Sequence, residues 1–230
     1  MSFKADIVTL FPKLFPGPLE ASIIGRGLER ELWNLNIVNL RSFATSKHKN
    51  VDDTPYGGGP GMVLRADVLG RAIDSISPEN DPRPRLLMSP RGKLFTQETA
   101  RKLASSPGVV LICGRFEGVD QRIIEARNLM EISIGDYVLA GGEIAAMAIL
   151  EATVRLLPGV LGSSISSHEE SHENNLLEYP QYTRPQNFEG LEIPAILTSG
   201  DHGKIKQWRH DQSKLLTARI RPDMLTKKMK

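Results

Sequence analysis

The stretch "VVLICGRFEGVDQRI" (109–123) contains one complete unit of the fold that we predict for this chain. Its first five residues are apolar and rich in Val and Ile, which is typical of a buried β-strand. Gly114 and Gly118 then mark a loop, and helical periodicity resumes over residues 119–127. The segment is therefore expected to form a strand, a glycine-containing loop and a helix in succession.

The same succession occurs four more times along the chain. Strands are predicted in "ADIVTLF" (5–11), "LNIVNL" (35–40), "RLLMS" (85–89) and "MEISI" (130–134), and helices over residues 19–32, 65–77, 96–105 and 141–157. Thr96 is a helix N-cap by its position before Gln97 and Glu98, and Pro158-Gly159 is a helix stop. Strands that alternate with helices indicate an α/β fold, with a largely parallel sheet and helices on both of its faces.

Length and composition restrict the class of protein further. The chain has 230 residues, and 40% of them are hydrophobic, which suffices for a substantial core. The segment "MSFKADIVTLFPKLFPG" (1–17) lacks the features of a signal peptide, and no stretch of eighteen apolar residues follows. Cys113 is alone, which excludes an internal disulfide and a cysteine-rich metal site. We therefore expect a cytoplasmic protein without a membrane span.

The composition changes after residue 160, where "GVLGSSISSHEESHENN" (159–175) carries few apolar residues. We predict a first domain over residues 1–160, a linker or lid over 161–175, and a small helical domain over 176–230. Residues 204–219 of that domain are amphipathic, with one predicted apolar face that contains Ile205, Trp208, Leu215 and Leu216.

The charge of the chain is distributed unevenly. The formal net charge is +2, but residues 201–230 hold nine Lys or Arg against three Asp, which gives +6 there and −4 elsewhere. A basic segment of this kind is expected of a protein that binds nucleic-acid phosphates, and it is equally typical of a solvated basic helix.

The segment His168-Glu169-Glu170-Ser171-His172 matches the H-E-x-x-H pattern of zinc metalloproteases. That pattern requires a helix, which the serines around 163–167 and the asparagines at 174–175 disfavour. Possible third zinc ligands, Glu189 and Glu192, are separated from it by prolines. A zinc hydrolase therefore remains a minor alternative to a polar surface loop.

Three glycine-containing loops follow predicted strands, in "MSPRGK" (88–93), "CGRFEGVD" (113–120) and "SIGDYVLAGGE" (133–143). Neither the G-x-G-x-x-G nor the G-x-x-x-x-G-K-[ST] nucleotide loop occurs. The carboxyl ends of parallel strands are where ligands bind in open α/β sheets. Glu117 and Asp136 are suited to accept hydrogen bonds from ribose hydroxyls or an ammonium group. The three loops together predict a site for a cofactor with an adenine-like apolar part.

A fourth loop, "HKNVDDTPYGGGPGM" (48–62), is too long and too glycine-rich for a plain connection. Loops of this length in compact domains are commonly functional. Asp52 and Asp53 within it are also explained as turn or capping residues.

Taken together, six motifs resemble the bacterial tRNA (guanine-N1)-methyltransferase family, the TrmD family of the SPOUT superfamily, through nearly the whole chain. The motifs are "DDTPYGGGPGM" (52–62), "SPRGK" (89–93), "CGRFEGVDQRI" (113–123), "SIGDYVLAGGE" (133–143), "PGVLG" (158–162) and "YPQYTRP" (179–185). The resemblance implies a SPOUT-type parallel sheet with a deep trefoil knot, bent S-adenosylmethionine bound in the knot, a homodimer, and a small C-terminal helical domain that binds tRNA. It makes no prediction about Mg²⁺.

The family's cofactor contacts correspond here to residues of the three glycine loops. They are Met88, Ser89, Pro90, Gly114, Glu117, Ile134, Gly135, Asp136, Tyr137, Val138, Leu139, Gly141 and Gly142. The family's catalytic arginine corresponds to Arg155, which a helix C-terminal cation that complements the dipole would also explain. For tRNA binding we select the basic residues Lys204, Lys206, Arg209 and Lys214.

The family's catalytic base is an aspartate followed by serine, and the corresponding residue here is Glu170 before Ser171. The sequence departs from the family at this position, and Glu169 is a rival base. His172 and Asn175 also replace the family's commoner phenylalanine and glycine. The implied reaction is methylation at N1 of the guanosine 3′ to the anticodon, with a carboxylate taking the N1 proton and Arg155 stabilising charge on O6.

Two alternatives to this function remain open at the level of sequence. One is a SPOUT methyltransferase that acts on another RNA. The other is a non-catalytic RNA-binding module, which the basic C-terminal segment and the altered base position would suit.

Overall fold

The computed structural model describes residues 2–161, 171–172 and 175–226. The chain divides into two compact units, Met1–Gly162 and Ser163–Lys230, which are described separately below. Most of the predicted 161–175 linker, including Glu169 and Glu170, lies outside the described residues.

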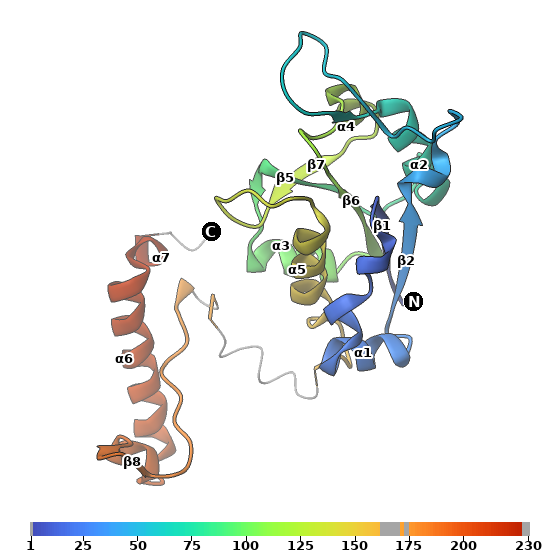
Figure 1. Cartoon of the computed structure of the whole chain (residues 1–230). Coiled ribbons are helices and arrows are strands. Elements are labelled where there is room, and N and C mark those ends of the chain that lie inside the picture. The colour runs from blue at the N-terminus through green and yellow to red at the C-terminus, as the bar shows by residue number, and fades with distance from the viewer. Residues whose placement is uncertain (1, 162–170, 173–174, 227–230) are drawn as a thin grey trace. The chain divides into compact units, whose positions relative to one another are not determined.

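The first unit is built on a five-stranded sheet with the order β2-β1-β6-β5-β7 (Figure 1). The strands are β1 (Phe3–Thr9), β2 (Trp33–Asn39), β5 (Arg85–Leu94), β6 (Gly108–Cys113) and β7 (Met130–Ser133). All four pairings are parallel. The strands that precede the three glycine loops, β6, β5 and β7, are therefore neighbours, and the predicted α/β class with a parallel sheet is confirmed.

Helices cover both faces of this sheet, as predicted. They are α1 (Ser22–Glu29), α2 (Ala66–Ile76), α3 (Gln97–Ala104), α4 (Gln121–Ala126) and α5 (Glu143–Val154), with short 3₁₀ helices η1 (Pro12–Leu14), η2 (Gly17–Glu20) and η3 (Leu40–Phe43). One core packs α1, α3 and α5 against the sheet, and the other packs α2 and α4. Alternate residues of a strand enter different cores: Ile7 joins the first and Val8 the second.

The helix boundaries follow the local signals closely. Thr96 caps α3, and its hydroxyl accepts a hydrogen bond from the Thr99 amide at 3.3 Å. The helix predicted over residues 19–32 is instead divided into η2 and α1, because Ala21 between them is extended and Ser22, the first residue of α1, has a left-handed φ of 55°. Gly159, with a φ of 84°, lies in the turn beyond α5, as expected of a helix stop.

A buried charge cluster lies between β1 and the connection that precedes β5. Arg83 pairs with Asp6 of β1 and, at 2.7 Å, with Asp81. The side chains of Arg83 and Asp81 are 9% and 7% exposed. Asn36 donates a hydrogen bond to the other oxygen of Asp6. These charges are paired and hydrogen-bonded, which is the condition under which buried charges are tolerated.

This cluster predicts a loss of stability in acid. Burial alone would raise the pKa of Asp81, but hydrogen bonds from Arg83 and Ser77 outweigh it and lower the pKa from 3.8 to about 2. Because the folded pKa lies below the unfolded value, the stabilisation is present above about pH 4 and is lost as the pH falls toward 2. We expect a contribution of about 2 kcal/mol to the free energy of unfolding, measured by urea denaturation at stepped pH. Asp81→Asn should flatten this part of the profile, and an equally steep profile in that variant would contradict the assignment.

The second unit consists of helices and a short hairpin. It contains β8 (Asn187–Phe188), β9 (Leu191–Glu192), η6 (Ala195–Thr198), α6 (His202–Ile220) and α7 (Pro222–Thr226). Asp201 caps α6 by accepting a hydrogen bond from the Lys204 amide at 3.0 Å. The ring of Trp208 lies 6.3 Å from that of Tyr182. The predicted helical character of this part of the chain is confirmed.

The predicted apolar face of α6 is wrong at one position. Ile205, Trp208 and Leu216 are partly buried, but Leu215 is 64% exposed. The buried positions of the helix are Ser213 and Thr217 instead. The Leu177 amide donates to the Thr217 hydroxyl at 2.9 Å, so a polar contact with the preceding segment defines this face of the helix.

Candidate active site

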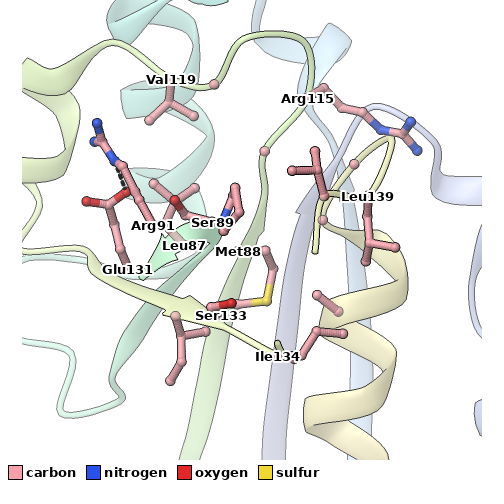
Figure 2. Close-up of a pocket in the computed structure, with 18 of the residues that line it drawn as sticks. Leu87, Met88, Ser89, Arg91, Arg115, Val119, Glu131, Ser133, Ile134 and Leu139 are labelled. Carbon is pink, nitrogen blue, oxygen red and sulfur yellow. Dashed lines mark hydrogen bonds and ion pairs between the residues drawn. The ribbon is translucent and has the colours of Figure 1, made fainter. Parts of the chain in front are cut away.

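A cavity of about 310 Å³ lies at the carboxyl ends of β5, β6 and β7 (Figure 2). Residues 87–91, 114–119 and 131–135 and the segment 137–142 line it, together with Ala145 of α5. These are the three glycine loops selected from the sequence. The three loops lie close together because the strands that precede them, β6, β5 and β7, are adjacent and parallel.

All but one of the predicted cofactor residues line this cavity. They are Met88, Ser89, Pro90, Gly114, Glu117, Ile134, Gly135, Tyr137, Val138, Leu139, Gly141 and Gly142. Asp136 is the exception, since it does not contribute to the lining. The twelve residues come from three segments of the chain that together span more than fifty positions of sequence, and the structure places them around one cavity.

Gly142 shows why the third loop requires glycine. A Cβ at this position would lie 2.7 Å from the Cβ of Met88 and 2.9 Å from the Cα of Cys113. The Gly142 amide donates to the carbonyl of Gly114 at 2.9 Å. The loop therefore runs directly against the ends of β5 and β6, where any side chain would collide with backbone.

The cavity offers both apolar walls and polar groups. Leu87, Met88, Ile132 and Leu139 supply apolar surface, and the Ser133 hydroxyl bonds to the Gly135 carbonyl at 2.8 Å. Tyr137, 54% exposed, stands at the rim. Apolar walls with a few fixed polar groups are the usual lining of a site for a small organic ligand.

Two charged residues of the lining were not selected from the sequence. Arg91 pairs with Glu131 at 2.6 Å and also donates to the Gln121 side chain at 2.8 Å. Figure 2 shows this pair across β5 and β7. The ion pair with Glu131 raises the pKa of Arg91. Arg91 lies in the quoted "SPRGK" motif, and Glu131 interrupts the apolar "MEISI" strand, so a signal for each was present.

A third residue of the lining, Arg115, belongs to a buried ion pair that the sequence analysis also missed. Its guanidinium lies 2.8 Å from the carboxylate of Glu143, whose side chain is 1% exposed. Glu143 is the first residue of α5, where the helix dipole favours a negative charge. The Thr9 hydroxyl donates to the other carboxylate oxygen of Glu143 at 2.7 Å.

Further contacts of Arg115 connect this pair to the loops. Its guanidinium donates to the Ala140 carbonyl at 3.0 Å and lies 4.2 Å from the centre of the Phe11 ring. A Cβ on Gly141 would collide with the guanidinium. The pair therefore fixes the second and third glycine loops to one another and to the end of β1.

Arg115 and Arg91 both have acidic partners, which leaves Glu117 as the remaining charged residue of the lining. Within residues 2–161, Glu117 makes no ion pair. Burial and the nearby Glu143 carboxylate raise the pKa of Cys113, which keeps this buried side chain a thiol. With Arg91 paired to Glu131 and Arg115 paired to Glu143, the Glu117 carboxylate is the charge of the lining that has no counterion within residues 2–161.

Arg155 does not lie at this cavity. It follows α5 as its C-cap residue, at the opposite end of the helix from Gly142 and Glu143. Twelve residues of helix span about 18 Å, so the side chain of Arg155 is remote from the cavity within one chain. Its position at a helix C-terminus agrees with the dipole interpretation.

The metalloprotease helix is not supported at the end of the pattern that the structure describes. His172 lies in a turn with a φ of 73°, which is incompatible with an α-helix. Asn175 is also left-handed, with a φ of 56°, as its replacement of a glycine suggests. Across the described ranges, no group of three or more His, Cys, Asp or Glu side chains is placed to hold a metal.

The four basic residues selected for tRNA binding all lie on α6. Lys206 and Lys214 are exposed, and Lys204 pairs with Asp201 at 3.2 Å. The guanidinium of Arg209 lies 4.8 Å from the ring centre of Tyr179.

In the part of the chain that the structure covers, every helix is too short or too polar to cross a membrane.

Comparison with known proteins gives one consistent result. The model of the family described as tRNA (Guanine-1)-methyltransferase TrmD matches residues 3–227. A tRNA (guanine-N(1)-)-methyltransferase of Mesorhizobium japonicum is 61% identical over 225 residues, which cover 98% of this chain and 97% of the relative. One of Rhizobium etli is 60% identical over 227 residues, covering 99% and 97%. The chain belongs to the tRNA (guanine-N1)-methyltransferase (TrmD) family.

Proposed function

We propose that this protein transfers a methyl group from S-adenosylmethionine to N1 of the guanosine 3′ to the anticodon in tRNA, and that it does so in the cytoplasm. The observation that carries the proposal is the cavity at the ends of β5, β6 and β7. Its lining includes residues of three of the motifs by which the chain resembles the TrmD family, "SPRGK", "CGRFEGVDQRI" and "SIGDYVLAGGE".

The residues of the cavity fit S-adenosylmethionine. Backbone groups of the glycine loops approach closely because Gly142 and Gly114 lack side chains, and the apolar walls suit an adenine ring. The Glu117 carboxylate favours a ligand with positive charge, such as a sulfonium or ammonium group. The cofactor, when bound, supplies an electrophilic methyl group on sulfur.

The chemistry asked of the protein is the removal of one proton. S-adenosylmethionine held by the three glycine loops would supply the methyl group to N1, with its sulfur leaving as a neutral thioether. The N1 proton of guanine must pass to a base, which we assign to the Glu170 carboxylate, with Glu169 as the alternative. Arg155 stabilises the negative charge that develops on O6.

We infer a homodimer, and the distance between Arg155 and the cavity supports it if Arg155 acts in catalysis. Two lining residues are exposed and apolar, Tyr137 at 54% and Val138 at 83%, and Ile144 on α5 is 57% exposed. A second copy that covers this surface would also supply an Arg155 that the chain's own α5 holds about 18 Å away. A molecular mass of two chains in sedimentation is the expected result, and a monomer at micromolar concentration would contradict it.

We also infer the deep trefoil knot of the SPOUT fold. The close approach of Gly142 to Met88 and Cys113 supports it, since the chain passes directly against the ends of two central strands there. The pairing of β5 with β7 also shifts register between Met88 and Lys93, so β5 departs from a regular strand beside that approach.

The test is incubation with labelled S-adenosylmethionine and tRNA transcripts, followed by nucleoside mapping. We expect 1-methylguanosine at the position 3′ to the anticodon. A methyl group on another atom or RNA class would favour a SPOUT enzyme with a different target. RNA binding without turnover would favour a non-catalytic module, whereas measurable cofactor binding would count against that alternative.

The four cations of α6 should contribute to tRNA binding by pairing with phosphates. Replacing Lys204, Lys206, Arg209 and Lys214 with glutamine is expected to weaken binding and to flatten its dependence on salt, by about one unit of slope for each phosphate that is no longer neutralised. Binding is measured over a range of salt concentrations. Lys102→Gln on α3, an exposed cation paired with Glu98, is the control. An unchanged slope would show that these four side chains are only solvated.

A further inference from the structure

Residues 171–178, which directly follow the assigned base in the chain, close into a turn within the second unit. The Ser171 hydroxyl accepts a hydrogen bond from the Glu178 amide at 3.0 Å. The His172 amide donates to the Leu176 carbonyl at 2.8 Å. His172 also has a left-handed φ of 73°, which is typical of a tight turn. The first residue of the turn is therefore held by a bond to its last.

One buried hydroxyl fixes this turn to α6. The Leu177 amide donates to the hydroxyl oxygen of Thr217 at 2.9 Å, and the same hydroxyl donates to the Ser213 carbonyl at 2.6 Å. Thr217 is 0% exposed. A threonine within a helix can donate to the carbonyl four residues earlier, and its oxygen can still accept a hydrogen bond from another group. Here that group belongs to the turn, so Thr217 defines where the turn meets α6.

Two aromatic contacts continue this attachment along the helix. The ring centre of Tyr179 lies 4.8 Å from the guanidinium of Arg209, and the ring centres of Tyr182 and Trp208 are 6.3 Å apart. The segment therefore runs antiparallel to α6, as the orange stretch beside the red helix shows in Figure 1. The helix that carries the cations selected for tRNA binding is thus the element that also holds the turn.

We propose that Thr217 is a positioning residue for methyl transfer, whose hydroxyl fixes the turn on α6 and so holds the Glu170 carboxylate within reach of the N1 proton. The proposal rests on the proposed function, because it takes Glu170 as the base. A general base acts only within hydrogen-bond distance of the proton that it removes, so a small displacement of the chain at Ser171 is sufficient to lower the rate. In this role Thr217 touches neither guanine nor the methyl donor, and it acts through the turn.

The test compares Thr217→Val with Thr217→Ser in the full-length protein. Valine nearly keeps the shape of threonine but leaves the Leu177 amide without its acceptor, whereas serine keeps the hydroxyl. The single-turnover rate at saturating tRNA and S-adenosylmethionine should fall about 10-fold in Thr217→Val, because a buried donor that loses its partner costs about that factor. Thr217→Ser should restore the rate. The dissociation constants of both ligands should be unchanged, because the cavity and the cations of α6 are retained.

A double-mutant cycle shows whether Thr217 acts through the base. Thr217→Val added to Glu170→Gln should not lower the residual rate any further, since the proton acceptor that it positions is already absent. Two losses that multiply would overturn the proposal. Thr198→Val is the matched control, because Thr198 is exposed and its hydroxyl donates within η6 to the Ala195 carbonyl at 3.0 Å. This variant should keep the wild-type rate.

The remaining outcomes distinguish a failure of the positioning role from a failure of the proposed function. If the wild type methylates tRNA and Thr217→Val does so equally fast, only the positioning role fails. A rate that stays low in Thr217→Ser would show a packing defect and would also overturn it. If the wild type transfers no methyl group to tRNA, the proposed function fails. Hydrogen exchange at the Leu177 amide then tests the contact by itself: it should be about 10-fold faster in Thr217→Val than in Thr217→Ser, and equal exchange would contradict the contact.

Discussion

Replacing Glu143 with alanine is expected to lower the free energy of unfolding by about 3 kcal/mol or more. The change leaves the Arg115 guanidinium without its counterion in a largely buried position, and the Thr9 hydroxyl loses its acceptor. Removing one partner of a buried pair costs far more than the net contribution of the pair, because an uncompensated charge remains. Urea denaturation followed by circular dichroism measures the effect.

An exposed pair in the same unit provides the comparison. Lys102 and Glu98 on α3 are each 74% exposed and lie 2.6 Å apart. Glu98→Ala should cost less than about 1 kcal/mol, as is usual for surface pairs. If Glu143→Ala proves equally mild, water reaches Arg115 in the variant, and the pair does not fix the two glycine loops as we infer. Cofactor affinity should fall together with stability, because both loops line the cavity.

Replacing Glu170 with glutamine is expected to lower the rate of methyl transfer by about 10²-fold or more, which is the usual scale for general-base catalysis. Glutamine keeps the shape of the side chain but cannot accept the N1 proton. Affinity for S-adenosylmethionine should be nearly unchanged, since every residue that lines the cavity in the described part of the chain belongs to the first unit. Single-turnover rates and calorimetry separate the two quantities.

Glu169→Gln is the matched control for this experiment. It is expected to remain active, since Glu169 does not occupy the position that corresponds to the family's aspartate. If Glu169→Gln loses activity while Glu170→Gln retains it, the base is Glu169. Should both variants remain active, neither glutamate is the base and another group takes the proton.

The sheet and the cavity were predictable from sequence because both depend on local patterns. Strands such as 109–113 are continuous apolar runs, and the loops after β5, β6 and β7 are marked by glycine. Because these three strands are parallel neighbours in the sheet, the loops at their carboxyl ends lie next to one another. The close approach of Gly142 to Cys113 is a tertiary contact. The sequence therefore indicated a glycine-containing loop, but it did not show why glycine is required at position 142.

The residues that sequence reasoning missed act through partners distant in the chain. Glu143 and Thr9 are 134 positions apart, and no periodicity links them. Leu215 was assigned to the wrong face of α6 because apolar spacing alone ignores the hydrogen bond between Leu177 and Thr217. Arg155 corresponds to the family's catalytic arginine, but the sequence did not show how far it lies from the cavity. That distance depends on the length of α5 and on the position of the loops at the other end of this helix.

Each of the two units contains one tryptophan, so the fluorescence emission of each tryptophan reports on one unit. Trp33 is fully buried, and burial shields its ring from collisional quenchers. Its indole N–H donates to the Ile24 carbonyl at 3.0 Å. Trp208 lies on the basic helix beside Tyr182, with part of its ring in solvent. In a Trp208→Phe protein, the remaining fluorescence therefore follows the sheet unit alone. In a Trp33→Phe protein, acrylamide quenching would follow the docking of RNA on α6 without any attached dye.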